Sequence, residues 1–241
     1  MRNGMQDIDL SGIRGILFDK DGTLIDFQKS WGPPLRVAML DAARGDATLA
    51  RQLLIRGGMD PDTGITRADS LFAAAHTREI AAGLVEAGAA FDLDALTLML
   101  DAHFVRAADH GVPVTDLAAL FRTLRERGLE IGIASSDSEE AVWRTLQRFR
   151  ADRLVHFVAG YDSGHGAKPA PGMFHAFCEA RGLAPHEVAM VGDNLHDMDM
   201  GRAGGAGACI AVLTGTGTPE TLRKSSDMLL DSDADLPTLL G

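Results

Sequence analysis

Two aspartates, Asp19 and Asp21, stand two residues apart immediately before Gly22. They follow a short apolar run, which places them on a loop that leaves a predicted strand. Gly22 can adopt backbone angles that other residues avoid, so a turn there would bring both carboxylates toward one point. The pair alone is equally compatible with a solvated turn whose Asp side chains bond nearby backbone N–H groups. The interpretation therefore depends on the polar side chains that accompany it.

Further polar residues stand at or beyond the ends of other predicted strands. Ser135, Lys168 and Asp193 each hold such a position, and Asp197 follows at the start of a predicted helix. In open α/β sheets, ligands bind beyond the carboxyl ends of the parallel strands. We therefore expect these side chains to meet the aspartate pair at one edge of a sheet.

The expected cluster is rich in carboxylates. Asp19, Asp21, Asp193 and Asp197 would lie together with little positive charge around them. Their repulsion would be costly unless a cation sits among them or some are protonated. Oxygen ligands favour a hard ion, and a site with room for water and a substrate phosphate suits Mg²⁺. Lys168 and the serine hydroxyl then remain to hold phosphate oxygens.

The elements that must position these residues alternate between strands and helices. Short apolar runs rich in β-branched residues predict buried strands at 13–18, 129–134, 157–159, 188–191 and 208–213. A helix is predicted over 115–127, capped by Thr115 and ended by Gly128, and Ser138 is expected to begin the next helix. Alternating strands and helices indicate an α/β fold, a Rossmann-like parallel sheet with helices on both faces.

The stretch from residue 27 to residue 112 breaks this rhythm. It is rich in alanine, helical in pattern and free of strand signals, so we interpret it as a small helical domain inserted after the first strand. The core domain would then comprise residues 1–26 and 113–241. Pro33 and Pro34 fit the first turn of a helix better than its middle.

Charge and composition exclude several classes of partner. The net charge of -11 argues against nucleic acid and anionic membranes, which reward clustered Lys and Arg. Cys178 and Cys209 have neither disulfide nor metal-ligand spacing. No signal peptide is apparent, and no apolar run approaches the ~20 residues needed to span a bilayer, so we expect a cytoplasmic protein.

The motifs described above, taken together, resemble those of a known family. The sequence is similar to the haloacid dehalogenase (HAD) superfamily, and to phosphoglycolate phosphatases within it, in four ordered motifs: Asp19-Lys20-Asp21-Gly22-Thr23, Ser135, Lys168-Pro169, and Gly192-Asp193-Asn194-Leu195-His196-Asp197. The resemblance implies a helical cap between the first two motifs. It also implies a phosphatase that acts on small phosphorylated metabolites, with 2-phosphoglycolate as the first candidate.

The same resemblance implies a role for each motif residue. Asp19 would be the nucleophile, and Asp21 would be the acid and base, its backbone carbonyl also touching the metal. Ser135, Ser136 and Lys168 would bind the phosphoryl group, while Asp19, Asp21, Asp193 and Asp197 would hold Mg²⁺. Such a scheme is chemically sensible, because one carboxylate attacks while its neighbour shuttles protons.

Two features of the motifs refine the resemblance. Ser136 and Asp137 stand where many relatives have Thr-Asn, which puts the contact of that Asn in doubt. Dehalogenases lack an acid two residues after the nucleophile, and transport ATPases carry Thr there. Asp21 therefore favours phosphate-ester chemistry over both.

Three other functions share parts of this pattern. A phosphomutase of the β-phosphoglucomutase kind would share the aspartate pair and the cap. A calcium-binding EF-hand beginning at Asp19 would need Gly at its sixth position and Glu at its twelfth, where Leu24 and Ser30 stand. A catalytically dead binding module on the same fold is disfavoured because every motif side chain is present.

Several further residues carry weaker signals. His165 could touch substrate, although a lone loop histidine is more often solvated, and His196 is expected on the surface at a helix start. Arg36, Arg67 and Arg78 could reach a substrate carboxylate from the cap. The glycine-rich residues 204–217 lack the pattern of a nucleotide-binding loop and are interpreted as a helix end and a tight turn.

Overall fold

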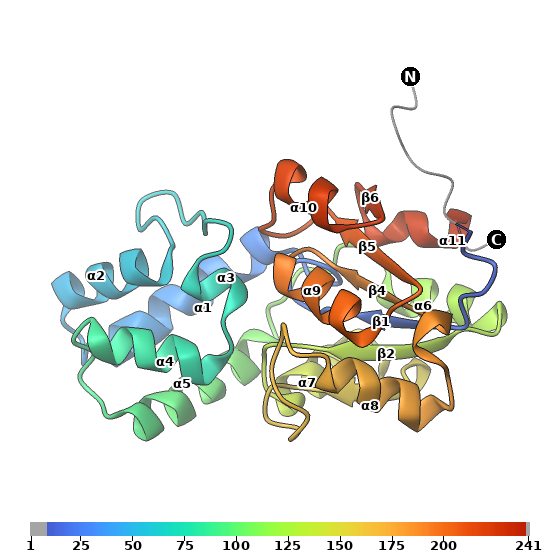
Figure 1. The fold of residues 1–241 in the computed structure, drawn as a ribbon. Coiled ribbons are helices and arrows are strands. Elements are labelled where there is room, and N and C mark those ends of the chain that lie inside the picture. Colours follow the sequence, from blue (N-terminus) through green and yellow to red (C-terminus); the bar gives the residue numbers. More distant parts are fainter. Residues whose placement is uncertain (1–8, 240–241) are drawn as a thin grey trace.

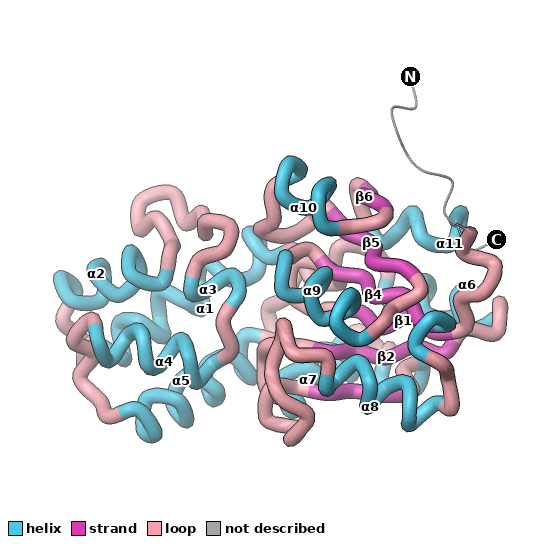
Figure 2. Tube along the Cα trace, viewed as in Figure 1, coloured by secondary structure: helices cyan, strands magenta, loops and turns pink. Residues whose placement is uncertain are grey.

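The computed structural model describes residues 9–239, which build a six-stranded parallel sheet with helices around it (Figures 1 and 2). The strand order is β3-β2-β1-β4-β5-β6, with all neighbours parallel. The strands are β1 (Gly15–Phe18), β2 (Glu130–Ala134), β3 (Phe157–Ala159), β4 (Val188–Gly192), β5 (Ala208–Val212) and β6 (Met228–Leu230). The predicted α/β class is confirmed, as are the five predicted strands to within two residues at each end.

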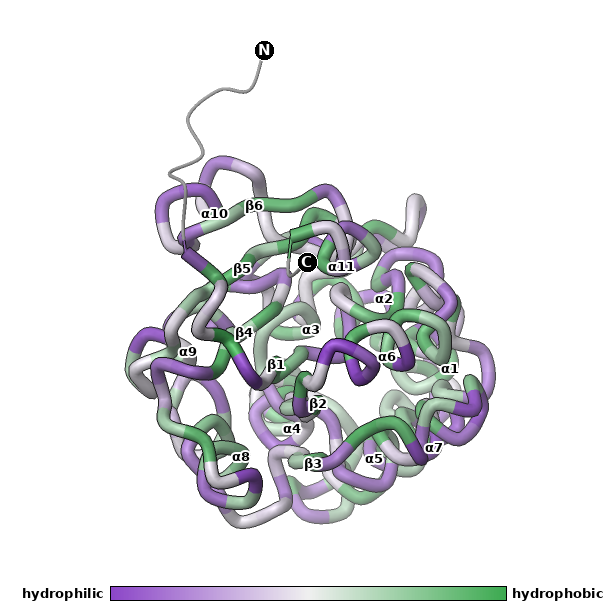
Figure 3. Tube along the Cα trace, turned by 90° about the vertical axis from the view of Figure 1, so that its right-hand side faces the viewer, coloured by the Kyte–Doolittle hydropathy of each residue, from purple (hydrophilic) through white to green (hydrophobic). Residues whose placement is uncertain are grey.

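Helices cover both faces of this sheet. They are α6 (Leu117–Glu126), α7 (Glu139–Arg148), α8 (Gly172–Arg181), α9 (Leu195–Gly204), α10 (Pro219–Ser225) and α11 (Leu236–Leu239), with 3-10 turns at Asp152–Leu154, Pro185–Glu187 and Asp233–Asp235. Successive side chains of a strand point to opposite faces. Phe18 thus packs with α6 and α7 in one apolar cluster, whereas Leu17 packs with α8 and α9 in another. The sheet is therefore apolar on both faces, and much of the strand trace is green, the hydrophobic colour, in Figure 3.

Strand register aligns the loops that carry the motifs. Phe18, the last residue of β1, pairs with Ile133 of β2 on one side and with Val191 of β4 on the other. The residues that follow these three strand ends therefore emerge at the same edge of the sheet.

Five helices lie between β1 and α6 and form a separate group beside that edge (Figure 1). They are α1 (Phe27–Ala42), α2 (Ala47–Gly57), α3 (Leu71–Ala74), α4 (Thr77–Glu86) and α5 (Leu93–Ala107). Their apolar side chains pack into a hydrophobic cluster of their own, with Leu53, Leu84 and Leu100 fully buried. We call these helices and their connections, residues 27–112, the helical segment.

The prolines of α1 lie deeper in the helix than the sequence pattern predicts. The helix begins at Phe27, capped by the Asp26 side chain, which accepts a hydrogen bond from the Lys29 N–H. Pro33 and Pro34 are therefore inside the helix and not in its first turn. Packing of the buried face of α1, which includes Trp31, outweighs the backbone hydrogen bonds that the prolines cannot donate.

Two other details differ from the sequence prediction. A sixth strand, β6, follows α10, and its three residues are too few for a periodic signal. Helix α6 begins at Leu117 with Asp116 as its cap, not Thr115, because the Asp116 carboxylate accepts a hydrogen bond from the Ala119 N–H. Ser138 caps α7 as predicted. Between residues 9 and 239, none of the helices has the length and apolar character needed to cross a membrane.

Candidate active site

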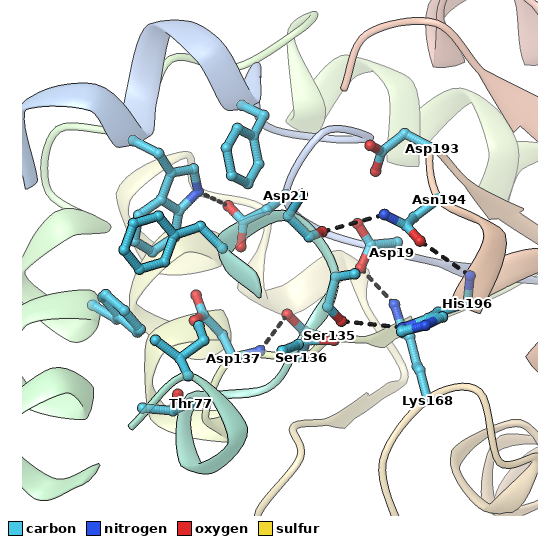
Figure 4. Close-up of a pocket in the computed structure, with 18 of the residues that line it drawn as sticks. Asp19, Asp21, Thr77, Ser135, Ser136, Asp137, Lys168, Asp193, Asn194 and His196 are labelled. Carbon is cyan, nitrogen blue, oxygen red and sulfur yellow. Dashed lines mark hydrogen bonds and ion pairs between the residues drawn. The ribbon is translucent and has the colours of Figure 1, made fainter. Parts of the chain in front are cut away.

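The motif residues gather around one cavity between the sheet edge and the helical segment (Figure 4). Asp19, Ser135 and Asp193 reach it from the ends of β1, β2 and β4, and Lys168 reaches it from the loop between β3 and α8. The cavity has a volume of about 60 Å³. This is well below the ~300–1,000 Å³ of ordinary ligand pockets, and we interpret the structure as a closed form for that reason.

Asp19 is held at the sheet edge by the neighbouring strand. Its backbone N–H donates to the carbonyl of Val191 at 2.8 Å, which continues the β1–β4 ladder by one residue. The chain then turns at Gly22, where φ is +92°. A Cβ atom on Gly22 would lie 2.4 Å from the Asp193 carboxylate, so only glycine allows the two motif loops to approach.

Lys168 joins two of the buried carboxylates. Its Nζ atom lies 2.5 Å from Asp19 Oδ1 and 2.6 Å from Asp197 Oδ1. Burial alone would lower the pKa of Lys168, but the charges of the two aspartates outweigh it and raise the pKa above its usual value. Lys168 is therefore a permanent positive charge at the centre of the site.

One lysine does not neutralise this group of carboxylates. Oxygen atoms of Asp19, Asp193 and Asp197 lie within 4.8 Å of one another, and all three residues are buried. Burial raises the pKa of Asp19 to about 7 against the opposing effect of Lys168. Burial and the charges of the other two aspartates raise the pKa of Asp193 well above its usual value. Three converging carboxylates with unfavourable ionisation have the donor set and charge that a hard divalent cation requires.

Asp193 sits in a niche made by backbone. The Thr216 N–H donates to Asp193 Oδ2 at 2.8 Å, and a Cβ atom on Gly215 would lie only 1.8 Å from the same oxygen. The interpretation of residues 204–217 as a helix end and a turn is right for Gly205, which ends α9 in the left-handed conformation. It misses Gly215, whose missing side chain makes room for Asp193.

Asp21 faces a different set of partners. Trp31 Nε1 of α1 donates to Asp21 Oδ1 at 2.9 Å, and Lys20 Nζ lies 2.5 Å from Asp21 Oδ2. Its carboxylate is not part of the cluster formed by Asp19, Asp193 and Asp197. The site thus contains one carboxylate group around Lys168 and a second around Lys20.

Lys20 also pairs with Asp137, one of the two residues that stand where many relatives have Thr-Asn. Its Nζ atom lies 2.8 Å from Asp137 Oδ2, so one buried lysine bridges Asp21 and Asp137. Burial raises the pKa of Asp137 to about 6, opposed by the Lys20 charge. The Asp137 N–H donates to Ser135 Oγ at 3.1 Å, and Ser136 lines the cavity beside it. Lys20 lies within the first motif, but nothing in the sequence pattern indicates that it bridges these two carboxylates.

The helical segment touches the fourth motif through main-chain atoms. Asn194 Nδ2 donates to the carbonyl of Ala73 at 3.3 Å, and His196 Nδ1 lies 3.2 Å from the carbonyl of Ala74 (Figure 4 shows both histidine and asparagine at the cavity). His196 stands at a helix start, as predicted, but it is half-buried and lines the cavity, so the expectation of a surface residue is wrong.

The other candidate residues lie elsewhere. None of His165, Arg36, Arg67 and Arg78 is among the residues that line the cavity. Arg36 donates to the carbonyl of Pro61, and Arg78 is paired with Asp94. The side chains that the helical segment does place in the cavity, such as Trp31, were not identified from the sequence, because no local pattern shows which helix face will meet the sheet.

Comparisons with known proteins agree with this geometry. A family model described as haloacid dehalogenase-like hydrolase matches residues 13–205. The phosphoglycolate phosphatase of Pseudomonas putida is 25% identical over 235 residues, which cover 93% of this chain and 79% of that protein. The pyrophosphatase PpaX of Bacillus pumilus is 26% identical over 135 residues, covering 55% of this chain and 62% of PpaX.

Solved structures share the fold along most of the chain. The crystal structure of CbbY from Rhodobacter sphaeroides in complex with phosphate has a TM-score of 0.70 at 20% identity, covering 93% of this chain and 96% of CbbY. A putative β-phosphoglucomutase from Thermotoga maritima has a TM-score of 0.67 at 15% identity, covering 95% and 98%. At such low identity these likenesses show the fold alone. The family model covers most of the chain and includes all four motifs, so the protein belongs to the haloacid dehalogenase-like hydrolase family.

Proposed function

We propose that this protein is a magnesium-dependent phosphatase that hydrolyses a small phosphomonoester through a phospho-aspartate at Asp19. The observation that carries the proposal is the separation of two carboxylates on one loop. Asp19 is bound to Lys168, whereas Asp21 is bound to Trp31 and Lys20. Adjacent carboxylates in different surroundings are suited to different tasks.

The chain's own residues can perform both halves of the reaction. Lys168 and the hydroxyls of Ser135 and Ser136 would hold the phosphoryl oxygens while a carboxylate oxygen of Asp19 attacks phosphorus. The P–O bond to the leaving alcohol breaks, and Asp21 gives its proton to that alcohol. Asp21 then takes a proton from water, which attacks phosphorus and releases phosphate and free Asp19.

Asp19, Asp193 and Asp197 are the residues that would hold Mg²⁺, together with the backbone carbonyl that the resemblance implies at Asp21. The convergence of their oxygens and the raised pKa values of Asp19 and Asp193 support this assignment. When bound, the ion would offset the carboxylate charge and polarise the phosphoryl group. Lys168 would supply the second fixed positive charge against which negative charge develops.

The helical segment would act as the cap, and residues 1–26 with 113–241 as the catalytic domain. The small cavity supports a cycle in which the cap opens to admit substrate and closes to exclude water. A closed cavity also favours small metabolites over phosphoproteins and nucleic acids. The phosphoglycolate phosphatase of P. putida makes 2-phosphoglycolate the first compound to assay.

Two conservative variants test the proposal. Asp19→Asn should abolish turnover, because an amide cannot serve as the nucleophile. Asp21→Asn should still transfer phosphoryl from p-nitrophenyl phosphate, whose leaving group needs no proton, and then stall for lack of a base. A rapid quench followed by intact-mass measurement should detect the phosphorylated protein in Asp21→Asn and not in Asp19→Asn.

Two outcomes would contradict the proposal. Turnover by Asp21→Asn at the parent's rate on both alkyl and aryl phosphates would remove its acid–base role. Formation of an isomeric sugar phosphate without release of phosphate would instead indicate a phosphomutase, which the same aspartate pair and cap could also support.

A further inference from the structure

We infer that this site selects phosphomonoesters whose leaving alcohol is uncharged and largely apolar, and discriminates against those that carry a carboxylate. The inference rests on the proposed phosphatase function and concerns the half of the substrate that is not phosphate. It follows from the difference between the two walls of the cavity.

The wall contributed by the helical segment is apolar. Its larger side chains are those of Trp31, Leu35, Phe72, Ile80 and Phe104. Trp31 packs edge-on against Phe104 with ring centroids 5.0 Å apart, and its indole N–H is already bonded to Asp21. The other side chains on this wall are one more phenylalanine, three alanines and the hydroxyl of Thr77 (labelled in Figure 4). The lining that the structure describes includes no cation from the helical segment.

The opposite wall already has an excess of negative charge. Five aspartates line the cavity, and Lys168 is the one lysine or arginine among the lining residues that the structure describes. Its ammonium group lies 2.5 Å and 2.6 Å from Asp19 and Asp197, at the phosphoryl end of the site. Bound Mg²⁺ would also sit at that end, among the carboxylates. Neither positive charge is placed to meet a second anion near the cap.

None of the arginines of the helical segment is among the residues that line the cavity, and three of them are paired elsewhere. Arg36 donates to the Pro61 carbonyl at 2.6 Å, Arg56 pairs with Glu86, and Arg78 pairs with Asp94 at 2.8 Å. A substrate carboxylate enclosed against Phe72 and Leu35 would therefore be buried with no lysine or arginine to pair with. Burying an unpaired charge costs far more than burying an apolar group of the same size, so the closed form should reject it.

A heavily hydroxylated sugar is disfavoured for a related reason. Thr77 is the one side-chain hydroxyl on the apolar wall within the described lining. The remaining sugar hydroxyls that face this wall would lose water without gaining hydrogen bonds. An alkyl or aryl alcohol with at most one polar group near Thr77 fits the wall best.

The test compares two esters matched in shape. Isobutyl phosphate and 2-phosphoglycolate have leaving groups with the same number of heavy atoms, branched at the same position, and only the second carries a carboxylate. Each is assayed as a substrate and as a competitor of p-nitrophenyl phosphate, so that a compound that binds without turnover is still ranked. We expect isobutyl phosphate to be favoured by at least about tenfold in kcat/KM or in inhibition constant.

A substitution on the apolar wall should weaken this preference. Ala75 lines the cavity and is half-buried, so Ala75→Lys would bring an ammonium group to the cap side. We expect it to lower the preference for isobutyl phosphate by about tenfold, because the carboxylate now has a partner. Ala75→Gln adds similar length without charge and should leave the ratio within about twofold.

The outcomes separate this inference from the function on which it rests. Equal or better use of 2-phosphoglycolate by the parent protein, alongside turnover of p-nitrophenyl phosphate, would overturn the inference and leave the phosphatase in place. Equal changes in Ala75→Lys and Ala75→Gln would show that charge at the apolar wall does not set the preference. Failure to release phosphate from any of the three esters with Mg²⁺ present would overturn both.

Discussion

The sheet edge and the helical segment face each other across one cavity, yet they are built by different means. At the sheet edge, each polar residue is placed by strand register, as when the Asp19 N–H continues the ladder to Val191. In the helical segment, Trp31 and Phe104 reach the cavity because α1 and α5 pack together in that segment's own hydrophobic cluster. Backbone hydrogen bonding thus fixes the reacting groups, while side-chain packing shapes the space for the leaving group.

This difference suggests that the two walls will respond differently to substitution. At the sheet edge a change removes a charge that other buried charges need, so effects should be large and hard to compensate. On the helical side a change alters contacts that neighbouring side chains can partly restore. In order of decreasing expected effect on turnover, three experiments test this contrast and a fourth concerns a buried carboxylate outside both walls.

The largest effect should come from the carboxylates that would hold Mg²⁺. Asp193→Asn keeps the shape of a buried side chain that accepts from the Thr216 N–H but removes its charge. We expect the kcat/KM of this variant to fall by about a thousandfold or more. The parent protein should likewise lose its activity in a chelator and regain it with Mg²⁺ but not with Ca²⁺. Asp199→Asn, at an exposed position on the following helix α9, should keep parent activity. Full turnover in chelator would rule out the metal.

Lys168→Met should come next, and it should affect folding as well as catalysis. Without the lysine, Asp19 and Asp197 lose a charge partner that lies within 2.6 Å of both. We expect at least about a hundredfold loss in kcat/KM, and a loss of stability of about 3 kcal/mol because buried carboxylates are left unpaired. Thermal unfolding with and without Mg²⁺ would measure this, and Mg²⁺ should recover part of the stability. Lys224→Met, which breaks an exposed pair with Glu220, serves as the control and should leave unfolding unchanged.

Trp31→Phe tests the hydrogen bond by which the helical wall contacts the proposed acid–base residue, Asp21. The change keeps an aromatic ring against Phe104 but removes the N–H that donates to Asp21. We expect about a tenfold fall in kcat on alkyl phosphates and a smaller fall on p-nitrophenyl phosphate, which needs no acid. Trp143→Phe removes an equivalent hydrogen bond, to Glu139, away from the cavity and should have no such effect. Equal falls on both ester types would mean that Trp31 does not act through Asp21.

The smallest effect on turnover should come from a buried carboxylate outside the cavity. Asp233 is fully buried, and its pKa is raised to about 6 by burial, which its hydrogen bonds to Ser232 and Ala234 oppose. The folded protein therefore holds this proton more tightly than the unfolded chain does. Ionised Asp233 lowers the free energy of unfolding by its full amount above about pH 6 and not at all below about pH 4.

Asp233→Asn removes that cost without touching the site. We expect stability to rise by about 2 kcal/mol at pH 8, the gain to shrink between pH 6 and pH 4, and kcat/KM to stay at the parent value. Denaturant unfolding at several pH values would measure it. A gain of the same size at pH 3.5 would show that ionisation of Asp233 is not the cause.

The two walls also differ in how far the sequence predicted them. Asp19, Ser135 and Asp193 were identified because each follows an apolar run, and parallel strands bring such positions together. Their assembly at one edge needed no knowledge of packing. The niche of Asp193 was missed because it depends on Gly215, which approaches from a loop well along the chain.

The helical wall could not be predicted in the same way. The pattern of α1 indicates a helix, but nothing local decides that Trp31 will face Asp21 while Arg36 turns to Pro61. Pro33 and Pro34 even suggested a later helix start than the one found. Contacts between helices far apart in the chain decide these orientations, and a single sequence carries little record of them.

The helical segment contacts the fourth motif in a way that should allow its substrate specificity to change. Asn194 and His196 contact the carbonyl oxygens of Ala73 and Ala74, which are present whatever side chains those positions carry. Substitutions along residues 73–75 could therefore reshape the space for the leaving group while the segment still docks in the same place. Directed evolution aimed at a new phosphate ester would do well to begin with these three alanines, where a change in preference is least coupled to a loss of closure.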